Sequence, residues 1–188
     1  MRFTDPSADP AGVLVDRAKL ERRALWYLDR FDATEQKLRS VLRRFIDKTI
    51  PRESSEQRQA AYQLSDDLIR RYASSGLVDD ERFAAAAVRG MRRRGDSSRK
   101  VVQRLLARGV PLEIAERVLA EASCDANGEA ELEAARALVR RRRLGPFRPE
   151  PQRSERRQRD LAALGRAGFD RATALRALTE QDGDEPDR

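Results

Sequence analysis

The sequence contains no histidine and one cysteine, Cys124, among its 188 residues. The lack of histidine excludes Ser-His-Asp and Cys-His catalytic arrangements and metal motifs that use two histidines. A single cysteine can form neither an internal disulfide nor a cysteine cluster for zinc. No apolar run approaches the roughly 20 residues that a membrane helix needs, and residues 1–15 lack a signal-peptide core. We therefore expect a cytoplasmic protein without a membrane partner.

Motifs for nucleotide hydrolysis and metal-dependent cleavage are also missing. The sequence has no glycine-rich phosphate loop ending in Gly-Lys-Ser/Thr. Its acidic clusters are Asp66 with Asp67, and residues 79–81. Adjacent residues on a helix do not face each other, and acidic residues at 79–81 suit the positive end of a helix dipole. We expect no enzymatic activity, no catalytic residue, no cofactor and no bound metal.

The composition favours helices, and its basic charge is concentrated in two blocks. The 27 Ala and 20 Leu outnumber the 10 Val and 4 Ile, which prefer strands. The net charge is +7. Residues 89–108 hold eight basic and one acidic residue, and residues 140–159 hold nine and two. Such concentration indicates a polyanion or an acidic protein surface as the partner.

Apolar periodicity predicts helices in groups of three. In the first group, Thr34 is the expected N-cap of a helix with Leu38 and Leu42 on its inner face, and Gly76 ends the next helix. The remaining inward residues expected in these groups include Phe31, Leu64, Val101, Val102, Leu105, Leu106 and Leu112. Residues 144–151 contain three prolines and a glycine and are interpreted as a linker.

The groups resemble one another. A shift of 59 positions places Gly109 on Gly168 and Val110 on Phe169, a repeated Gly-apolar step. A shift of 64 positions places Ser98 on Thr34. We therefore predict an all-α fold of three tandem three-helix repeats in an elongated, curved array. The expected divisions are a disordered leader at 1–14, repeats at 15–77, 78–124 and 125–179, and an acidic, disordered tail at 180–188.

Four segments carry a resemblance to a known family. They are GLVDDERFA at 76–84, LLARGV at 105–110, LAALGRAGFD at 161–170 and ALWYLDRFDATEQKLRSVL at 24–42. In this order they resemble the RecX family, bacterial regulators of the RecA recombinase. The matching structural-motif positions are Asp79, Asp80, Phe83, Ala84, Gly109, Gly168 and Phe169. The first repeat departs from the pattern because it lacks the Gly-apolar step, and Asp170 stands where the family often has serine.

The resemblance implies a non-enzymatic regulator of recombination and DNA repair, linked to the SOS response. Such a protein binds RecA, free or as a filament on DNA, and inhibits filament extension, ATP hydrolysis and strand exchange. We expect a monomer with at most weak direct DNA binding. The alternative is a helical-repeat protein whose target is DNA itself, bound through its basic ridges.

Basic residues at helical spacing are the candidate contacts with RecA or DNA. Lys100, Arg104 and Arg108 recur every four residues, away from the apolar stripe, and predict one cationic ridge. The other candidates are Arg89, Arg92, Arg93 and Arg94 before this ridge, Arg140, Arg141, Arg142 and Arg143 at a helix end, and Arg39 and Arg43 in the first repeat. A solvated helix face would produce the same pattern.

Overall fold

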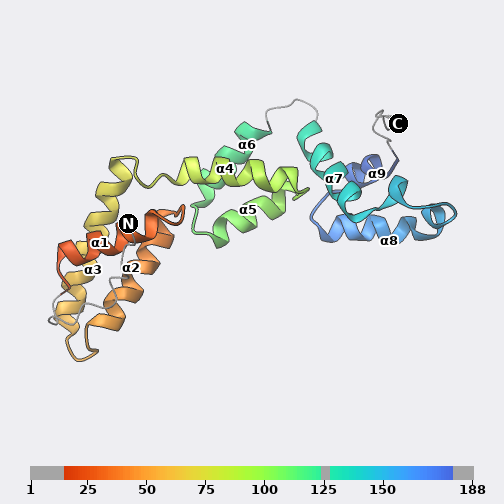
Figure 1. The fold of residues 1–188 in the computed structure, drawn as a ribbon. Coiled ribbons are helices and arrows are strands. Elements are labelled where there is room, and N and C mark those ends of the chain that lie inside the picture. Colours follow the sequence, from red (N-terminus) through yellow and green to blue (C-terminus); the bar gives the residue numbers. More distant parts are fainter. Residues whose placement is uncertain (1–14, 124–127, 180–188) are drawn as a thin grey trace. The chain divides into compact units, whose positions relative to one another are not determined.

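A computed structural model describes residues 15–123 and 128–179, and the expected leader, the acidic tail and Cys124 lie outside these residues. The described chain is all-helical and contains no strand. Its helices follow one another in three groups of three (Figure 1). Their bounds are α1 Arg17–Leu28, α2 Glu35–Thr49, α3 Ser55–Ser74, α4 Asp80–Arg93, α5 Ser98–Ala107, α6 Leu112–Ala122, α7 Glu129–Arg142, α8 Gln152–Arg166 and α9 Arg171–Thr179, with a short 3-10 turn, η2, at Gly145–Phe147.

The chain divides into two compact units. The first comprises the chain up to Phe83 together with Arg108–Val110, and the second comprises Ala84–Ala107 and the chain from Pro111 onward. In the first unit, α1, α2 and α3 pack against one another around a core that includes Leu20, Leu38, Leu42, Ile46 and Ile69. In the second, α7 and α8 pack on α9, with Leu132, Leu138, Leu164, Phe169 and Ala174 buried between them.

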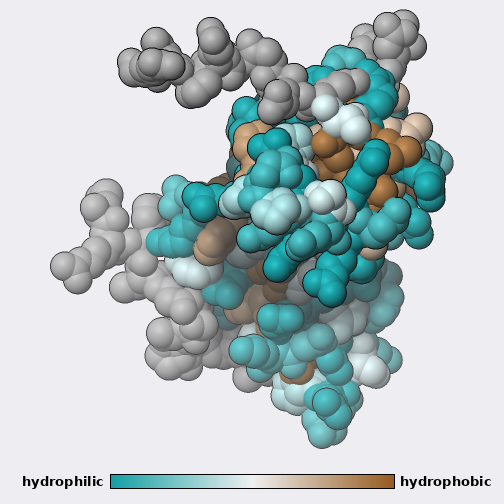
Figure 2. Space-filling view, turned by 90° about the vertical axis from the view of Figure 1, so that its right-hand side faces the viewer, coloured by the Kyte–Doolittle hydropathy of each residue, from teal (hydrophilic) through white to brown (hydrophobic). Residues whose placement is uncertain are grey.

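The prediction is wrong for four residues that were expected to face inward. Phe31, Leu64, Leu106 and Leu112 are 52%, 38%, 42% and 48% exposed. Most of the face drawn in Figure 2 is hydrophilic, and hydrophobic residues reach its surface only in small groups. Apolar spacing identifies a helix face that is wider than the part buried in the core. Apolar residues at the edge of that face therefore stay at the surface.

The register between α2 and α5 differs by one residue from the expected shift of 64. Leu38 and Leu42 in α2 are fully buried, as are Val101 and Leu105 in α5. Each pair is 63 residues apart, so Ser97 rather than Ser98 corresponds to Thr34. Both serines suit an N-cap by residue type, and only their partners, described below, distinguish them.

The segment interpreted as a linker is packed structure. Leu144 is buried, and residues 145–147 form the η2 turn. The buried Asp160 carboxylate of α8 accepts hydrogen bonds from the Gly145 N–H at 2.9 Å and from two nitrogens of Arg148, both at 2.8 Å. Because these bonds tie the segment to α8, its prolines lie in an ordered turn rather than in a loose linker.

Candidate partner-binding surface and repeat joints

The N-terminus of α2 is joined to residues of the second helical group. The Thr34 hydroxyl accepts a hydrogen bond from the Lys37 N–H at 3.1 Å, which makes Thr34 the N-cap as predicted. The same hydroxyl donates to the carbonyl oxygen of Arg108 at 2.8 Å. The next residue, Glu35, donates its N–H to the Asp80 carboxylate at 2.9 Å. The N-cap hydroxyl and the otherwise unsatisfied N–H of Glu35 thus both bind another part of the chain.

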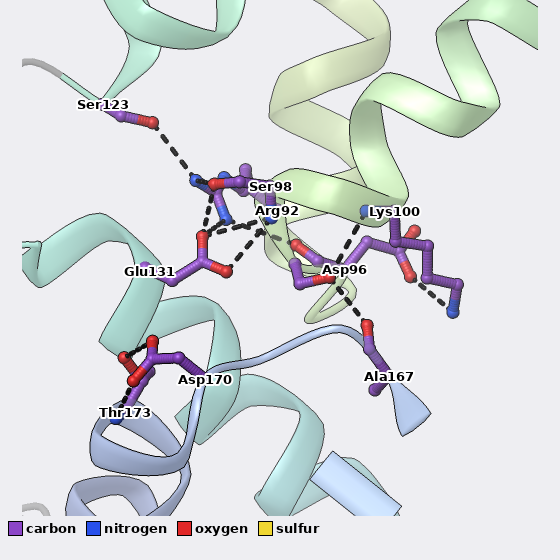
Figure 3. Close-up of polar contacts among 10 residues, drawn as sticks. Arg92, Asp96, Ser98, Lys100, Ser123, Glu131, Ala167, Asp170 and Thr173 are labelled. Atoms are coloured by element: carbon purple, nitrogen blue, oxygen red, sulfur yellow. Dashed lines mark hydrogen bonds and ion pairs between the residues drawn. The ribbon is translucent and has the colours of Figure 1, made fainter. Parts of the chain in front are cut away.

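The same arrangement recurs 63 residues later, at the N-terminus of α5 (Figure 3). The Ser97 hydroxyl accepts from the Lys100 N–H at 3.4 Å and donates to the carbonyl oxygen of Ala167 at 2.7 Å. The Ser98 N–H donates to the Glu131 carboxylate at 3.1 Å. We call each arrangement, an N-cap hydroxyl on a carbonyl and the next N–H on a carboxylate, a repeat joint.

The repeat joints explain the Gly-apolar step. Gly109 and Gly168 follow the two acceptor carbonyls and have φ of +85° and +96°, a backbone conformation that favours glycine. A Cβ on Gly109 would lie 2.7 Å from Cβ of Gln36, and one on Gly168 would lie 2.5 Å from Oγ of Ser97. Glycine therefore supplies both the turn and the space for the incoming helix start.

Asp79 and Asp80, the acidic pair in the RecX-like segment 76–84, have separate roles. Asp79 caps α4, because its carboxylate accepts the Arg82 N–H at 2.9 Å. Asp80 belongs to the first repeat joint, where burial raises the pKa of its carboxyl although the bond from Glu35 opposes that effect. Of the other residues in this segment, Ala84 is fully buried and Phe83 is half-buried. Sequence reasoning found the helix-start role but missed the contact with Glu35.

Arg92 is the centre of a polar network rather than a surface cation. Its side chain is only 13% exposed and forms an ion pair with Glu131 at 2.5 Å. It also donates to the hydroxyls of Ser98 at 2.8 Å and Ser123 at 3.1 Å. Figure 3 shows these groups meeting at the start of α5. The network links α4, α5, α7 and the end of α6, so Arg92 holds the second repeat joint in place.

The predicted cationic ridge on α5 is anchored to a buried carboxylate. Nζ of Lys100 lies 3.1 Å from Oδ1 of Asp96, and Arg104 pairs with the other oxygen of the same group. The Asp96 side chain is 2% exposed, against 31% for Lys100 and 43% for Arg104. Arg108 is exposed and follows the last residue of α5. Asp96 precedes Lys100 by four residues, a spacing from which this pair could have been predicted.

The smaller ridge in the first repeat is paired as well. Nε of Arg39 lies 3.0 Å from Asp66 Oδ1, and Arg43 lies 3.7 Å from Oδ2 of the same residue. Asp66 is on α3, so sequence spacing gave no signal for this contact.

The remaining candidates are exposed. Arg89 and Arg93 lie at the surface of α4, and Arg94, directly after this helix, is also exposed. The described part of the chain gives these three arginines no ion pair. Arg140 and Arg141, with Arg142 and Arg143, are exposed at the end of α7. The structure therefore distinguishes cations that pair with a carboxylate of the chain, such as Arg92 and Arg104, from exposed arginines such as Arg93, a distinction that charge counting cannot make. In residues 15–123 and 128–179, no group of three acidic or cysteine residues could hold a metal ion.

Comparison with known proteins identifies the family. The family model described as RecX, second three-helix domain, matches residues 79–119. The regulatory protein RecX of Myxococcus xanthus is 38% identical over 160 residues, which cover 85% of this chain and 83% of that protein. The regulatory protein RecX of Trichlorobacter lovleyi is 32% identical over 131 residues, covering 69% of this chain and 82% of that one.

A solved structure agrees with the fold. The crystal structure of regulatory protein RecX aligns with a TM-score of 0.58 at 22% identity, over 87% of this chain and 72% of that chain. Among the described residues, no helix has the length and apolar character to cross a membrane. On the identity to its curated relatives over most of their length, the chain belongs to the RecX family.

Proposed function

We propose that this chain binds the RecA recombinase, free or as a filament on DNA, and inhibits filament extension, ATP hydrolysis and strand exchange. The observation that carries the proposal is the 38% identity to a regulatory protein RecX over 160 residues. The sequence has no nucleotide-binding loop, so an effect on ATP hydrolysis acts through RecA. The proposed regulator acts in the cytoplasm as a monomer, without a cofactor or catalysis of its own.

Arg89 and Arg93 on α4, with Arg94 directly after this helix, are the proposed contacts with RecA. They are exposed, and guanidinium groups bind carboxylates and phosphates in a bidentate manner. Arg92, in the same stretch, is fixed to Glu131 and keeps the end of α4 in place beneath them. A partner can bind these three arginines without breaking an ion pair within the described chain.

Lys100 and Arg104 are less suited to such contacts. Binding a partner through both would leave the buried Asp96 carboxylate unpaired, and an uncompensated buried charge is costly. Arg39 and Arg43 lie between these cases, because Asp66 is 38% exposed and exposed ion pairs contribute little, about 0–1 kcal/mol. We rank the three exposed arginines on and directly after α4 first for this reason.

Direct binding of DNA is the second candidate function. The exposed arginines at the end of α7 favour it, because a cationic run binds phosphates and releases counterions. RecA binding in the absence of DNA distinguishes the two functions.

The test compares two triple variants in a pull-down with RecA and no DNA. Arg89, Arg93 and Arg94 are replaced with Gln in the first variant. Arg22, Arg44 and Arg52, which are exposed in the first unit, are replaced in the control. Both variants lose the same charge, so weaker capture of RecA by the first alone supports the proposed contact. Equal capture by both variants and the parent would contradict it.

A further inference from the structure

A hollow of about 540 Å³ lies between the end of α7 and the η2 turn, within the second unit. Its lining residues are Arg140, Arg143, Phe147, Arg148 and Pro149. Four of these five residues are charged or aromatic, and none has been given a task by the repeat joints described above.

The η2 turn beside the hollow is held by hydrogen bonds. Asp160 binds both the Gly145 N–H and the Arg148 guanidinium, so it fixes the η2 turn and neutralises Arg148. Phe147 is 47% exposed on this turn, between Pro146 and Pro149. An exposed aromatic ring on a fixed turn is a ready surface for stacking, because no ordering of the loop has to accompany binding.

Arg143 places a positive charge at the same hollow, and its backbone has an unfavourable conformation. Its φ and ψ are both 52°, a left-handed conformation that glycine adopts far more easily. Glycine has this role at Gly76 and Gly168, after α3 and α8. Arg143 is exposed and has no ion pair in the described part of the chain. The guanidinium of Arg143 is therefore available to a ligand at the hollow, on a backbone conformation of a kind that clusters at binding sites.

We propose that this hollow binds a nucleotide of a single-stranded nucleic acid, an inference that rests on the second candidate function above. The base stacks on Phe147 and the phosphate binds Arg143, with Arg140 at the same rim. Single-strand binding sites combine these two elements, a cationic groove and aromatic rings. An acidic peptide would satisfy the arginine but leave the exposed ring uncovered, whereas a nucleotide uses both groups.

The test measures binding of the full chain to a fluorescent 12-mer of thymidylate by anisotropy, without RecA, so its outcome is independent of the RecA proposal. Phe147→Ala should weaken binding at least about fivefold, whereas Phe31→Ala, which removes an equally exposed ring in the first unit, should not. On a 12-mer of abasic sites with the same phosphates, Phe147→Ala and the parent should bind equally. These two results together isolate stacking from charge.

Arg143→Gln tests the phosphate contact, with the exposed Arg171→Gln as the control of equal charge. The slope of log affinity against log salt should fall by about 0.7 in the first variant and by less in the control. The proposal is overturned if Phe147→Ala binds the thymidylate strand as the parent does. It is also overturned if a polyglutamate peptide displaces the strand and binds the Phe147→Ala variant unchanged, because charge alone would then explain the hollow.

Discussion

The Ser97 hydroxyl donates a 2.7 Å hydrogen bond to the carbonyl oxygen of Ala167, 70 residues further along the chain. Thr34 and Arg108 form the same bond at 2.8 Å. In both cases the residue after the acceptor is a glycine with positive φ. The Gly-apolar step of one helical group is thus the docking point for a helix start of the preceding group.

Gly168→Val should destabilise the protein strongly. The substitution forces a β-branched residue into a left-handed conformation, which costs about 1–2 kcal/mol, and it places Cβ 2.5 Å from the Ser97 hydroxyl. We expect a loss of more than about 2 kcal/mol in the free energy of unfolding. Gly165→Ala is the control, because Gly165 lies inside α8 with open space at its Cβ position, and it should gain up to about 1 kcal/mol. Equal urea midpoints for the two variants would contradict the claim that the second repeat joint requires glycine at position 168.

Ser97→Ala should cost about 1–2 kcal/mol, since it removes an N-cap and a hydrogen bond to Ala167 together. Ser40→Ala provides a comparison, because the Ser40 hydroxyl bonds only within α2, to the carbonyl oxygen of Gln36. Thermal unfolding of the two variants should show a clear loss for Ser97→Ala and a change within about 0.5 kcal/mol for Ser40→Ala. A neutral Ser97→Ala would show that the contact with Ala167 does not stabilise the fold.

Asp160→Asn should destabilise the second unit by about 2–3 kcal/mol at neutral pH, because the Arg148 guanidinium loses a charged acceptor. Asp67→Asn, on an exposed pair with Arg70, should change stability by less than about 1 kcal/mol. Chemical denaturation at pH 7 measures both.

The pH dependence of stability tests the same carboxylate. Burial alone would raise the pKa of Asp160, but bonds from Arg148 and the Gly145 N–H outweigh it and hold the pKa below its ordinary value. Its stabilisation is therefore complete above the unfolded-state pKa of about 3.9 and is lost as the pH falls through the lower folded-state pKa. The parent should lose more stability than Asp160→Asn on acidification below about pH 4. Parallel curves would refute the assignment.

Arg143→Gly should stabilise the protein by about 1 kcal/mol, because glycine adopts the left-handed conformation without strain. The same variant should bind single-stranded DNA more weakly if the hollow holds a phosphate. A calorimetric melting temperature unchanged or lowered by the substitution would show that Arg143 is not strained there.

Much of the architecture could be predicted from local patterns. Thr34 and Asp79 mark helix starts because their side chains cap the backbone, and Gly76 marks a helix end through its positive φ. Helices α2 and α3 follow from apolar spacing. The one-residue register error at α5 arose because Ser97 and Ser98 are equally good caps by residue type. Only Ala167 and Glu131, which lie 70 and 33 residues away from their partners, decide between them.

The candidate site was less predictable, because the sign of a charge does not show what it pairs with. Arg92 and Arg93 are neighbours of the same type, yet Arg92 is held by Glu131 and Arg93 is exposed. Lys100 and Arg104 are predicted to form a ridge with Arg108, and the structure pairs these two with the buried Asp96. Long-range ion pairs of this kind depend on tertiary packing, which helical spacing does not encode.

The central claim is tested most directly by the ATPase activity of RecA on single-stranded DNA, measured while this protein is titrated in. We predict that amounts below one per RecA slow hydrolysis, that the chain alone hydrolyses no ATP, and that the Arg89, Arg93 and Arg94→Gln variant inhibits less than the parent. RecA hydrolysis that stays unchanged at equimolar protein would contradict the proposed function.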